Sequence, residues 1–225
     1  MKEMVPTNYK TDNIIAWYDG IQNVGENQHS NSSDNWIDLT SNHNNIVLTR
    51  SSWDENSLYI EHDVHGTFTS KFKPVVEEIV IKIDEATSSY GECPVVCKLN
   101  GVGFYILHFS TSLYLYFTDN YNNINRNIRY YTTSPLKMGD KICVQVVIGE
   151  IQANNNAYGW KCFINGIERT VRYVDAGINV DDYDINGRTD KYFKGHIYSM
   201  RFHNAVLSDK ELKNNYKLDK KRFKI

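Results

Sequence analysis

Alternation of apolar and polar side chains with a period of two is the feature that most constrains this chain. Residues 78–84 put three isoleucines on one side of an extended backbone and charged side chains on the other. Residues 141–148 repeat the pattern with aliphatic side chains at every even position, and residues 113–117 follow it with leucine and phenylalanine. Successive side chains of a β-strand point to opposite faces, so each segment predicts a strand with one face in a core and the other in water.

Shorter apolar segments predict further strands, at residues 14–18, 58–60, 104–108, 128–131, 159–164 and 196–203. The dipeptides Asn100–Gly101 and Asn165–Gly166 tolerate the positive φ that tight hairpins require. The asparagine-rich stretches 119–127 and 154–156 have no periodicity and predict exposed loops. Many short strands joined by such turns predict an all-β sandwich or barrel.

One helix is predicted at the end of the chain, over about residues 208–219. Ser208 and Glu211 have the spacing of a capping box, in which each side chain satisfies a free backbone N–H of the other residue. Leu207 and Leu212 have the spacing of the accompanying hydrophobic staple. The lysines that follow suit the negative end of a helix dipole.

Length and composition set the class of protein. A chain of 225 residues fits one large β-sandwich, so residues 1–225 are predicted to form a single domain. The formal net charge is -2, which predicts neither nucleic acid binding nor attraction to an anionic membrane. The four cysteines, Cys93, Cys97, Cys143 and Cys162, have neither zinc-ribbon nor disulfide-scaffold spacing.

The sequence has no targeting or membrane-spanning pattern. Residues 1–6 lack the apolar core of a signal peptide, and no run of about 18 apolar residues occurs. We therefore expect a chain made in the cytoplasm without membrane insertion, which is virion-associated or released to the exterior.

Three stretches carry a family resemblance. They are Ile15–Gly20 followed by Trp36–Thr40, then Gly159–Gly166, which ends in Asn-Gly, and Tyr192–Leu212, where a final strand leads directly into a capped helix. Together they resemble the concanavalin A-like lectin/glucanase superfamily, in particular laminin G-like (LamG) domains of bacterial surface, phage and prophage proteins. The resemblance implies two antiparallel sheets stacked as a jelly roll. This fold hosts lectins, glycan hydrolases, adhesion modules and toxin subdomains, so it does not by itself imply a function.

Hydrolases of that superfamily carry a strand whose alternate carboxylates point into one cleft. The acidic candidate here is the segment 77–85, but its interior is apolar and Lys82 lies between Glu78 and Asp84 on their shared face. Two carboxyl groups about 5 to 5.5 Å apart are needed for a retaining mechanism. The sequence therefore predicts no catalytic residues and disfavours a laminarinase-like glycoside hydrolase.

Two segments are candidate metal sites. Four oxygen-bearing side chains have the spacing of a calcium loop: Asp182, Asp184, Asn186 and Asp190. The twelfth position, however, is Phe193 where a bidentate glutamate is expected, so an acidic exposed loop is the alternative. Residues 61–65 contain two histidines and two carboxylates, for which a surface loop is the commoner explanation than a transition metal.

Sugar recognition requires an aromatic ring beside amide or carboxylate groups. The candidate ligand-binding residues are Tyr90, Tyr121, Asn123, Asn125, Asn155, Tyr158 and Trp53, whereas the other three tryptophans are expected in the core. The leading hypothesis is a non-catalytic module that binds cell-surface carbohydrate, as part of a phage or prophage tail or another host-attachment apparatus. The alternative is a structural virion or assembly protein, with virion or surface proteins as partners.

Overall fold

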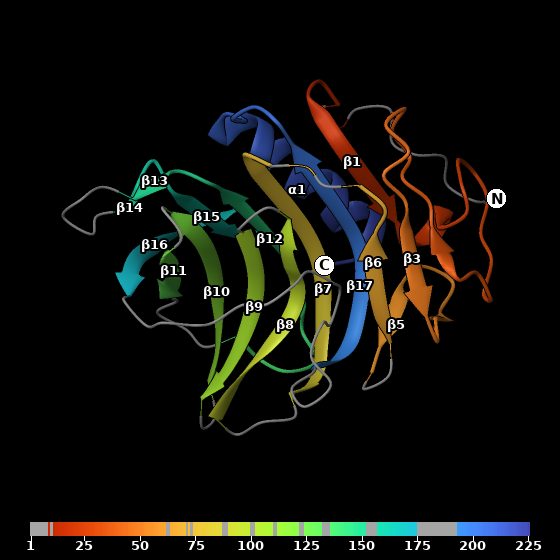
Figure 1. Ribbon diagram of the computed structural model, residues 1–225, viewed down its shortest axis with the longest axis horizontal. Coiled ribbons are helices and arrows are strands. Elements are labelled where there is room, and N and C mark those ends of the chain that lie inside the picture. The colour runs from red at the N-terminus through yellow and green to blue at the C-terminus, as the bar shows by residue number, and fades with distance from the viewer. Residues whose placement is uncertain are drawn as a thin grey trace.

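In the part of the chain that the structure describes, antiparallel strands make up nearly all of the regular structure, and a single α-helix lies on the outside (Figure 1). The computed structural model describes residues 9, 11–61, 64–70, 72, 74–86, 90–99, 102–109, 112–121, 124–131, 136–151, 157–174 and 193–225. The elements are β1 (Ile14–Asp19), η1 (Gly20–Gln22), β2 (Asn35–Trp36), β3 (Ile46–Thr49), β4 (Ser52–Trp53), β5 (Leu58–Ile60), β6 (His65–Phe68), β7 (Val76–Ala86), β8 (Tyr90–Leu99), β9 (Val102–Phe109), β10 (Ser112–Tyr121), β11 (Ile124–Tyr131), β12 (Lys141–Val147), β13 (Glu150–Ile151), β14 (Ala157–Tyr158), β15 (Lys161–Ile164), β16 (Ile167–Val174), β17 (Phe193–His203) and α1 (Asp209–Phe223).

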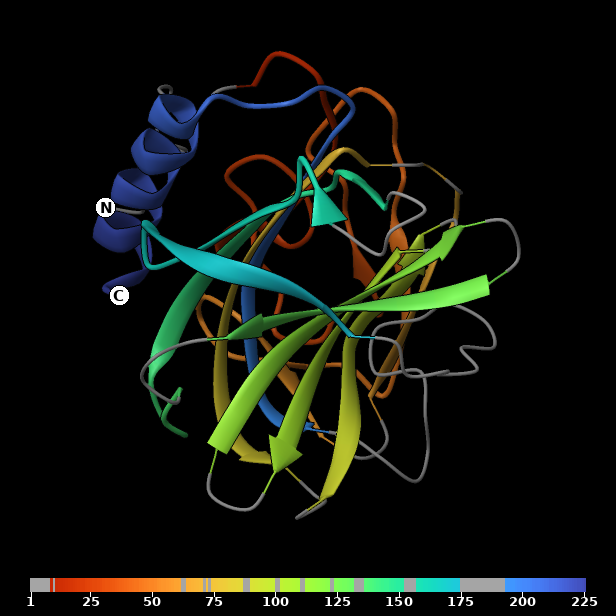
Figure 2. The same cartoon turned by 90° about the vertical axis from the view of Figure 1, so that its left-hand side faces the viewer.

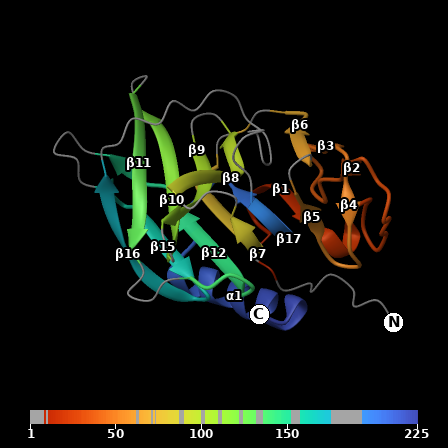
Figure 3. The same cartoon turned by 90° about the horizontal axis from the view of Figure 1, so that it is seen from below.

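The strands form two stacked layers. One layer has the order β4-β5-β17-β7-β12-β15, with β1 also paired to β17, and the other has the order β11-β10-β9-β8. β16 joins them, because its first residues pair with β15 and its last residues pair with β11. Figure 3 shows β8–β11 on one side, the layer of β7, β12 and β17 in the middle, and α1 beneath it, and Figure 2 shows α1 at the edge of the molecule. The predicted β-sandwich of the jelly-roll class is confirmed.

The predicted alternation places the core between the layers. On β7, Ile79, Ile81 and Ile83 are buried and face the interior, and Val144 and Val146 of β12 lie beside them. Aromatic rings from β1, β2 and β17 and leucines from β3, β5 and β10 complete the same cluster. Each buried aliphatic side chain contributes about 1.5–3 kcal/mol, so the pattern that predicted the strands also accounts for the stacking of the sheets.

The opposite face of β7 and β12 was expected in water, and this prediction is wrong for the part that α1 covers. Glu78, Cys143 and Gln145 are almost completely buried there, whereas Lys82 and Asp84, beyond the helix, are half-exposed and paired at 2.6 Å. A strand pattern reports which residues alternate, and it carries no information about a helix that docks from the end of the chain.

The predicted helix start is confirmed. Ser208 is the N-cap, both hydrogen bonds of the capping box with Glu211 are present, and Leu207 and Leu212 share one apolar cluster. The helix is longer than predicted and ends at Phe223, because its last turn is anchored by two buried side chains, Phe223 itself and Arg222.

The hairpin predicted at Asn165–Gly166 is also confirmed. Both residues have positive φ, and Ile164 pairs with Ile167 across the turn. Gly166 has a second requirement, because a Cβ there would lie 2.5 Å from the ring of Tyr216 on α1.

The loop predicted at residues 119–127 is wrong. β10 continues to Tyr121 and β11 begins at Ile124, with the two strands paired along this stretch. At Asn100–Gly101 the turn itself lies outside the described residues, but Leu99 of β8 pairs with Val102 of β9, as a hairpin requires.

A buried ionic cluster attaches α1 to the sheet. The Arg201 guanidinium donates to Glu78 at 3.1 Å and to Asp219 of α1 at 2.9 Å, and all three side chains are at most 1% exposed. A second pair, Arg222 and Asp19, lies about one turn further along the helix, with 3.1 Å between its charged groups. Within the described residues, the helices fall short of the length and apolar content that crossing a bilayer requires.

We expect Arg201→Met to lower the free energy of unfolding by about 3–5 kcal/mol, because it leaves two buried carboxylates without their cation. Urea unfolding monitored by tryptophan fluorescence measures the change. The matched control is Lys161→Met, which removes a half-exposed ion pair with Asp209 and should cost about 1 kcal/mol or less. Equal losses in the two variants would contradict this account of how α1 is held.

Candidate functional site

The adjacent glutamates Glu77 and Glu78 of β7 point to opposite faces of the sheet and lie in different electrostatic environments. Glu78 lies under α1 and accepts hydrogen bonds from four side chains, at 2.6 to 3.1 Å: Gln145, Arg201, His203 and Asn215. Burial alone would raise the pKa of Glu78, but the Arg201 guanidinium and the His203 hydrogen bond outweigh it and hold the pKa below its usual range. Glu78 is thus a permanently ionised structural anion.

Glu77 faces the interior between the sheets. It is 3% exposed, and burial raises its pKa to about 8, so the side chain is a neutral acid at neutral pH. Its alternate neighbour on the same face is Ile79. β7 therefore does not present the pair of carboxylates on one face that a glycoside hydrolase would use.

A second polar cluster lies on the outer face of the large sheet, beyond α1. His196 Nδ1 is 3.1 Å from the Ser57 hydroxyl, and His196 Nε2 is 3.2 Å from an Asp84 carboxylate oxygen. These distances match the order nucleophile, base and carboxylate of serine hydrolases. Ser57, however, is 0% exposed and also donates to Asp54, so its hydroxyl cannot reach a substrate.

The environment of His196 explains this cluster as a structural connection. The ring contacts Tyr59 at 5.1 Å and stacks on Tyr198 at 5.9 Å between centroids. Burial lowers the pKa of His196, against the opposing effect of Asp54 and Asp84, so the ring is neutral at neutral pH. These residues lie on or beside β5, β17 and β7, which are far apart in the sequence. No local sequence motif therefore predicted the cluster.

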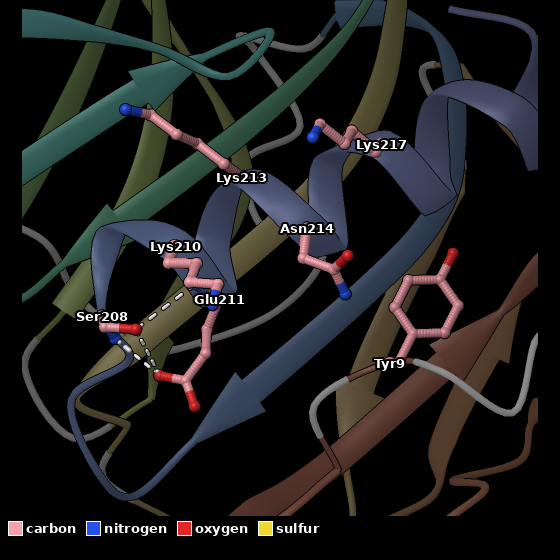
Figure 4. Close-up of a pocket in the computed structure, with 7 residues that line it drawn as sticks. All are labelled: Tyr9, Ser208, Lys210, Glu211, Lys213, Asn214 and Lys217. Atoms are coloured by element: carbon pink, nitrogen blue, oxygen red, sulfur yellow. Dashed lines mark hydrogen bonds between the residues drawn. The ribbon is translucent and has the colours of Figure 1, made fainter.

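The described residues form a groove beside α1, shown in Figure 4. Its volume is about 760 Å³. We call it the α1 groove, and its lining residues are Tyr9, Ser208, Lys210, Glu211, Lys213, Asn214 and Lys217. Hydrogen-bonding side chains thus surround one aromatic ring.

The ring of Tyr9 is held in place from several directions. Its hydroxyl donates to Asp219 at 2.8 Å, the Arg201 guanidinium lies 4.4 Å from the ring centroid, and Trp17 packs edge-on at 5.5 Å. Asn214 and Glu211 extend toward the side of α1 on which Tyr9 lies (Figure 4). The buried cluster that attaches the helix therefore also holds Tyr9, which forms a buried wall of the groove that the exposed Asn214 also lines.

A second groove, of about 650 Å³, lies next to it and is mostly apolar. It runs past Val147 and Ile148 to Val206, which is 65% exposed, and Ser208 lines both grooves. The helix N-terminus therefore separates a polar groove from an apolar one.

The sequence did not single out the α1 groove. Among the predicted ligand-binding residues, Trp53 is 7% exposed, packs against Trp36 at 5.1 Å and donates to the Ser33 carbonyl, so its ring belongs to the core. The one pattern that pointed to the groove was the capping box, which placed a helix there without showing what it faces.

The other predicted ligand-binding residues lie elsewhere or outside the described residues. Tyr90 begins β8, Tyr121 ends β10, Asn125 lies on β11 and Tyr158 lies on β14. Asn123 and Asn155 are outside the described residues. Tyr121 and Asn125 belong to one hairpin, since Tyr121 pairs with Ile124 and Asn125 with Asn120.

The metal predictions fall largely outside the described residues. This holds for all four predicted calcium ligands, Asp182, Asp184, Asn186 and Asp190, so a calcium site stays a prediction. In the segment 61–65, His62 and Asp63 are also outside, Val64 is buried and His65 begins β6. Within the described part of the chain, no group of three or more His, Cys, Asp or Glu side chains is arranged to hold a metal ion.

Known proteins share this fold without sharing the sequence. No protein-family model matches the chain, and no curated protein matches it in sequence. The receptor-binding domain of the botulinum neurotoxin C/D mosaic serotype superposes with a TM-score of 0.63 over 92% of this chain, at 14% identity. A botulinum neurotoxin serotype D ligand-binding domain in complex with N-acetylneuraminic acid has a TM-score of 0.59 at 13% identity, also over 92% of this chain.

A third similar structure is that of botulinum neurotoxin type C, whose cell entry is dependent on interaction with two ganglioside molecules. It superposes with a TM-score of 0.58 at 16% identity, again over 92% of this chain. In all three cases the match covers 51% of the neurotoxin chain, so this chain spans about half the length of the structures that it resembles. At these identities the similarity shows the fold alone.

The raised pKa of Glu77 predicts a loss of stability in alkali. Because the folded pKa, about 8, lies above the ordinary value of 4.5, the contribution of neutral Glu77 is complete below 4.5 and disappears as pH rises through 8. At about 1.4 kcal/mol per pH unit, the free energy of unfolding should fall by about 2–3 kcal/mol between about pH 6 and pH 9.

Glu77→Gln should remove this component, because a glutamine does not ionise. The exposed Glu168→Gln is the control and should retain the wild-type pH dependence. Urea titrations at several pH values measure the effect, and identical curves for wild type and Glu77→Gln would show that Glu77 does not titrate in this range.

Proposed function

We propose that the chain is a non-catalytic recognition module that binds cell-surface carbohydrate in the α1 groove. The observation that carries the proposal is the composition of that groove, in which the exposed Asn214 and several charged side chains lie beside the buried ring of Tyr9. Side chains that donate and accept several hydrogen bonds are suited to the hydroxyl groups of a sugar.

The chemistry of the carboxylates supports binding without hydrolysis. Glu78 is ionised and enclosed by four donors, Glu77 has an isoleucine as its alternate neighbour, and Ser57 is buried beneath His196. Each of these groups has a structural partner or environment that accounts for it. None of the three arrangements offers a nucleophile or acid in contact with the α1 groove.

The similar solved structures support the proposal through the fold. One is a receptor-binding domain, and another is a ligand-binding domain in complex with N-acetylneuraminic acid. Because this chain spans only half of those domains, the support does not extend to any individual binding residue. Placement in a phage tail or another host-attachment apparatus is part of the proposal that rests on the sequence resemblance alone.

A glycan array tests the proposal, with wild type and Asn214→Ala compared on the same slides. We expect wild type to bind a subset of glycans and Asn214→Ala to bind them about 5- to 10-fold more weakly, which corresponds to one or two lost hydrogen bonds. Asn204→Ala, an exposed asparagine that does not line the groove, is the matched control and should bind as wild type does.

An array that stays silent at high protein concentration would contradict the proposal. If the same preparation instead self-associates or captures a protein partner, the alternative role in assembly would be favoured. Equal binding by Asn214→Ala and wild type would retain carbohydrate recognition but place it away from the α1 groove.

A further inference from the structure

The solvent face of α1 is almost entirely lysine. Within the helix the exposed side chains are five lysines and Asn214. With the exposed C-cap residue they form what we call the lysine face: Lys210, Lys213, Lys217, Lys220, Lys221 and Lys224.

The acidic side chains of α1 are directed to other partners. Asp209 is paired with Lys161 at 2.7 Å, Glu211 accepts from the N-cap Ser208, and Asp219 is buried against Arg201. Charge is therefore sorted across the helix, with carboxylates at its start and on its buried side and cations on its outer side. The formal net charge of -2 is a sum over the whole chain, so it does not reveal this separation of charge on α1.

The lysine face is long and narrow. From Lys210 to Lys224 the helical rise of 1.5 Å per residue gives about 21 Å. Lys213, Lys217, Lys220 and Lys224 are spaced by three or four residues, so they follow one stripe along the helix. A single acidic group would engage one or two of these ammonium groups, whereas a chain with repeated anionic groups would engage most of them.

The shape and lining of the α1 groove favour some classes of polyanionic partner over others. Lys210, Lys213 and Lys217 line the same hollow as Tyr9 and Asn214, so a partner that reaches these lysines also meets hydrogen-bonding groups below the surface. A flat bilayer could not fill that hollow. Nucleic acid is disfavoured because the exposed cations of α1 are all lysines, while Arg222, the arginine of α1, is buried with Asp19.

We propose that the carbohydrate bound by this module is polyanionic, a chain of sugars carrying carboxylate or sulfate groups that lies along α1. Its anionic groups pair with the lysine face, and its hydroxyl groups enter the α1 groove beside Asn214. This inference rests on the proposed function and names the class of glycan.

Ion pairing of this kind makes affinity depend on salt. In the counterion-release relation established for nucleic acids, each neutralised anionic group contributes about 0.7–0.9 to the slope of log K against log salt. Three to five lysine contacts should therefore give a slope of roughly -2 to -4.

The experiment measures binding by calorimetry to five probes at several salt concentrations. Heparin carries sulfate and carboxylate groups, hyaluronan carries carboxylates only, and dextran is neutral. Polyglutamate is an anion without sugar, and phosphatidylserine vesicles present an anionic bilayer. We expect heparin, hyaluronan or both to bind at least tenfold more tightly than dextran, polyglutamate and the vesicles, and comparison of the first two identifies the anionic group.

Variants locate the site on α1. Lys217→Gln should weaken binding to the preferred glycan about 3- to 10-fold, and Lys213→Gln with Lys217→Gln should weaken it further and flatten the salt slope. Lys137→Gln, an exposed lysine away from α1, is the matched control and should stay within about twofold of wild type. Thermal melts establish that each variant is folded. All three lysines are exposed, so replacing them should leave the fold intact.

The outcomes separate this inference from the proposed function. If an array shows binding to neutral glycans and the polyanionic ones bind no more tightly, the carbohydrate module stands and the polyanionic class is overturned. Equal binding of polyglutamate or of the vesicles would overturn it as well, since the lysine face would then recognise charge without sugar. If no glycan of any kind binds, the proposed function fails and this inference with it.

Discussion

The contact between Arg201 and the two carboxylates of Glu78 and Asp219 is the interaction on which the rest of the structure depends. It joins β17, β7 and α1 in a space from which water is excluded, and it also fixes Tyr9, whose hydroxyl bonds to Asp219. Replacing a buried ion pair by apolar residues is often neutral for stability, but removing one partner is costly. A cluster of this kind therefore dictates position more than it adds stability. A helix with an apolar face alone could slide along the sheet, whereas one that must bring Asp219 to Arg201 has a single register.

The fixed register determines the surface that α1 presents. Once Leu212, Asn215 and Asp219 face the sheet, Lys213, Asn214 and Lys217 face solvent, whereas Tyr216 and Leu218 are half-buried. The aromatic and the amide of the α1 groove are held by the same placement, because Tyr9 contacts the buried end of Asp219 and Asn214 lies one residue before the buried Asn215. The buried contact with Glu78 and the exposed lysine face thus lie on opposite sides of one docked helix.

The parts of this structure that the sequence predicted are those governed by local periodicity. Three features can be predicted from a few consecutive residues: the isoleucines of β7, the even-numbered residues of β12 and the Ser208–Glu211 capping box. The outer face of β7 could not be predicted in this way, since Glu78 finds Arg201 and Asn215 at separations of 123 and 137 residues. The loop expected at 119–127 failed for the opposite reason: a polar hairpin forms strands through backbone pairing without an apolar alternation to reveal it. The lysines of α1 were visible in the sequence, but they read as favourable charges at a helix end until the buried face of the helix was known.

Adjacent glutamates on one strand show how the fold restricts the chemistry. Strand geometry sends Glu77 to the interior and Glu78 to the helix side, where their pKa values move in opposite directions because one has only burial and the other has Arg201 and His203. A hydrolytic pair on this strand would need carboxylates two residues apart on one face, and those positions hold Ile79 and Val80, both of which the core clusters require. Introducing the missing carboxylate would therefore place an unpaired charge in an apolar cluster on either face. The alternation that closes the sandwich is therefore incompatible with an acidic cleft on β7.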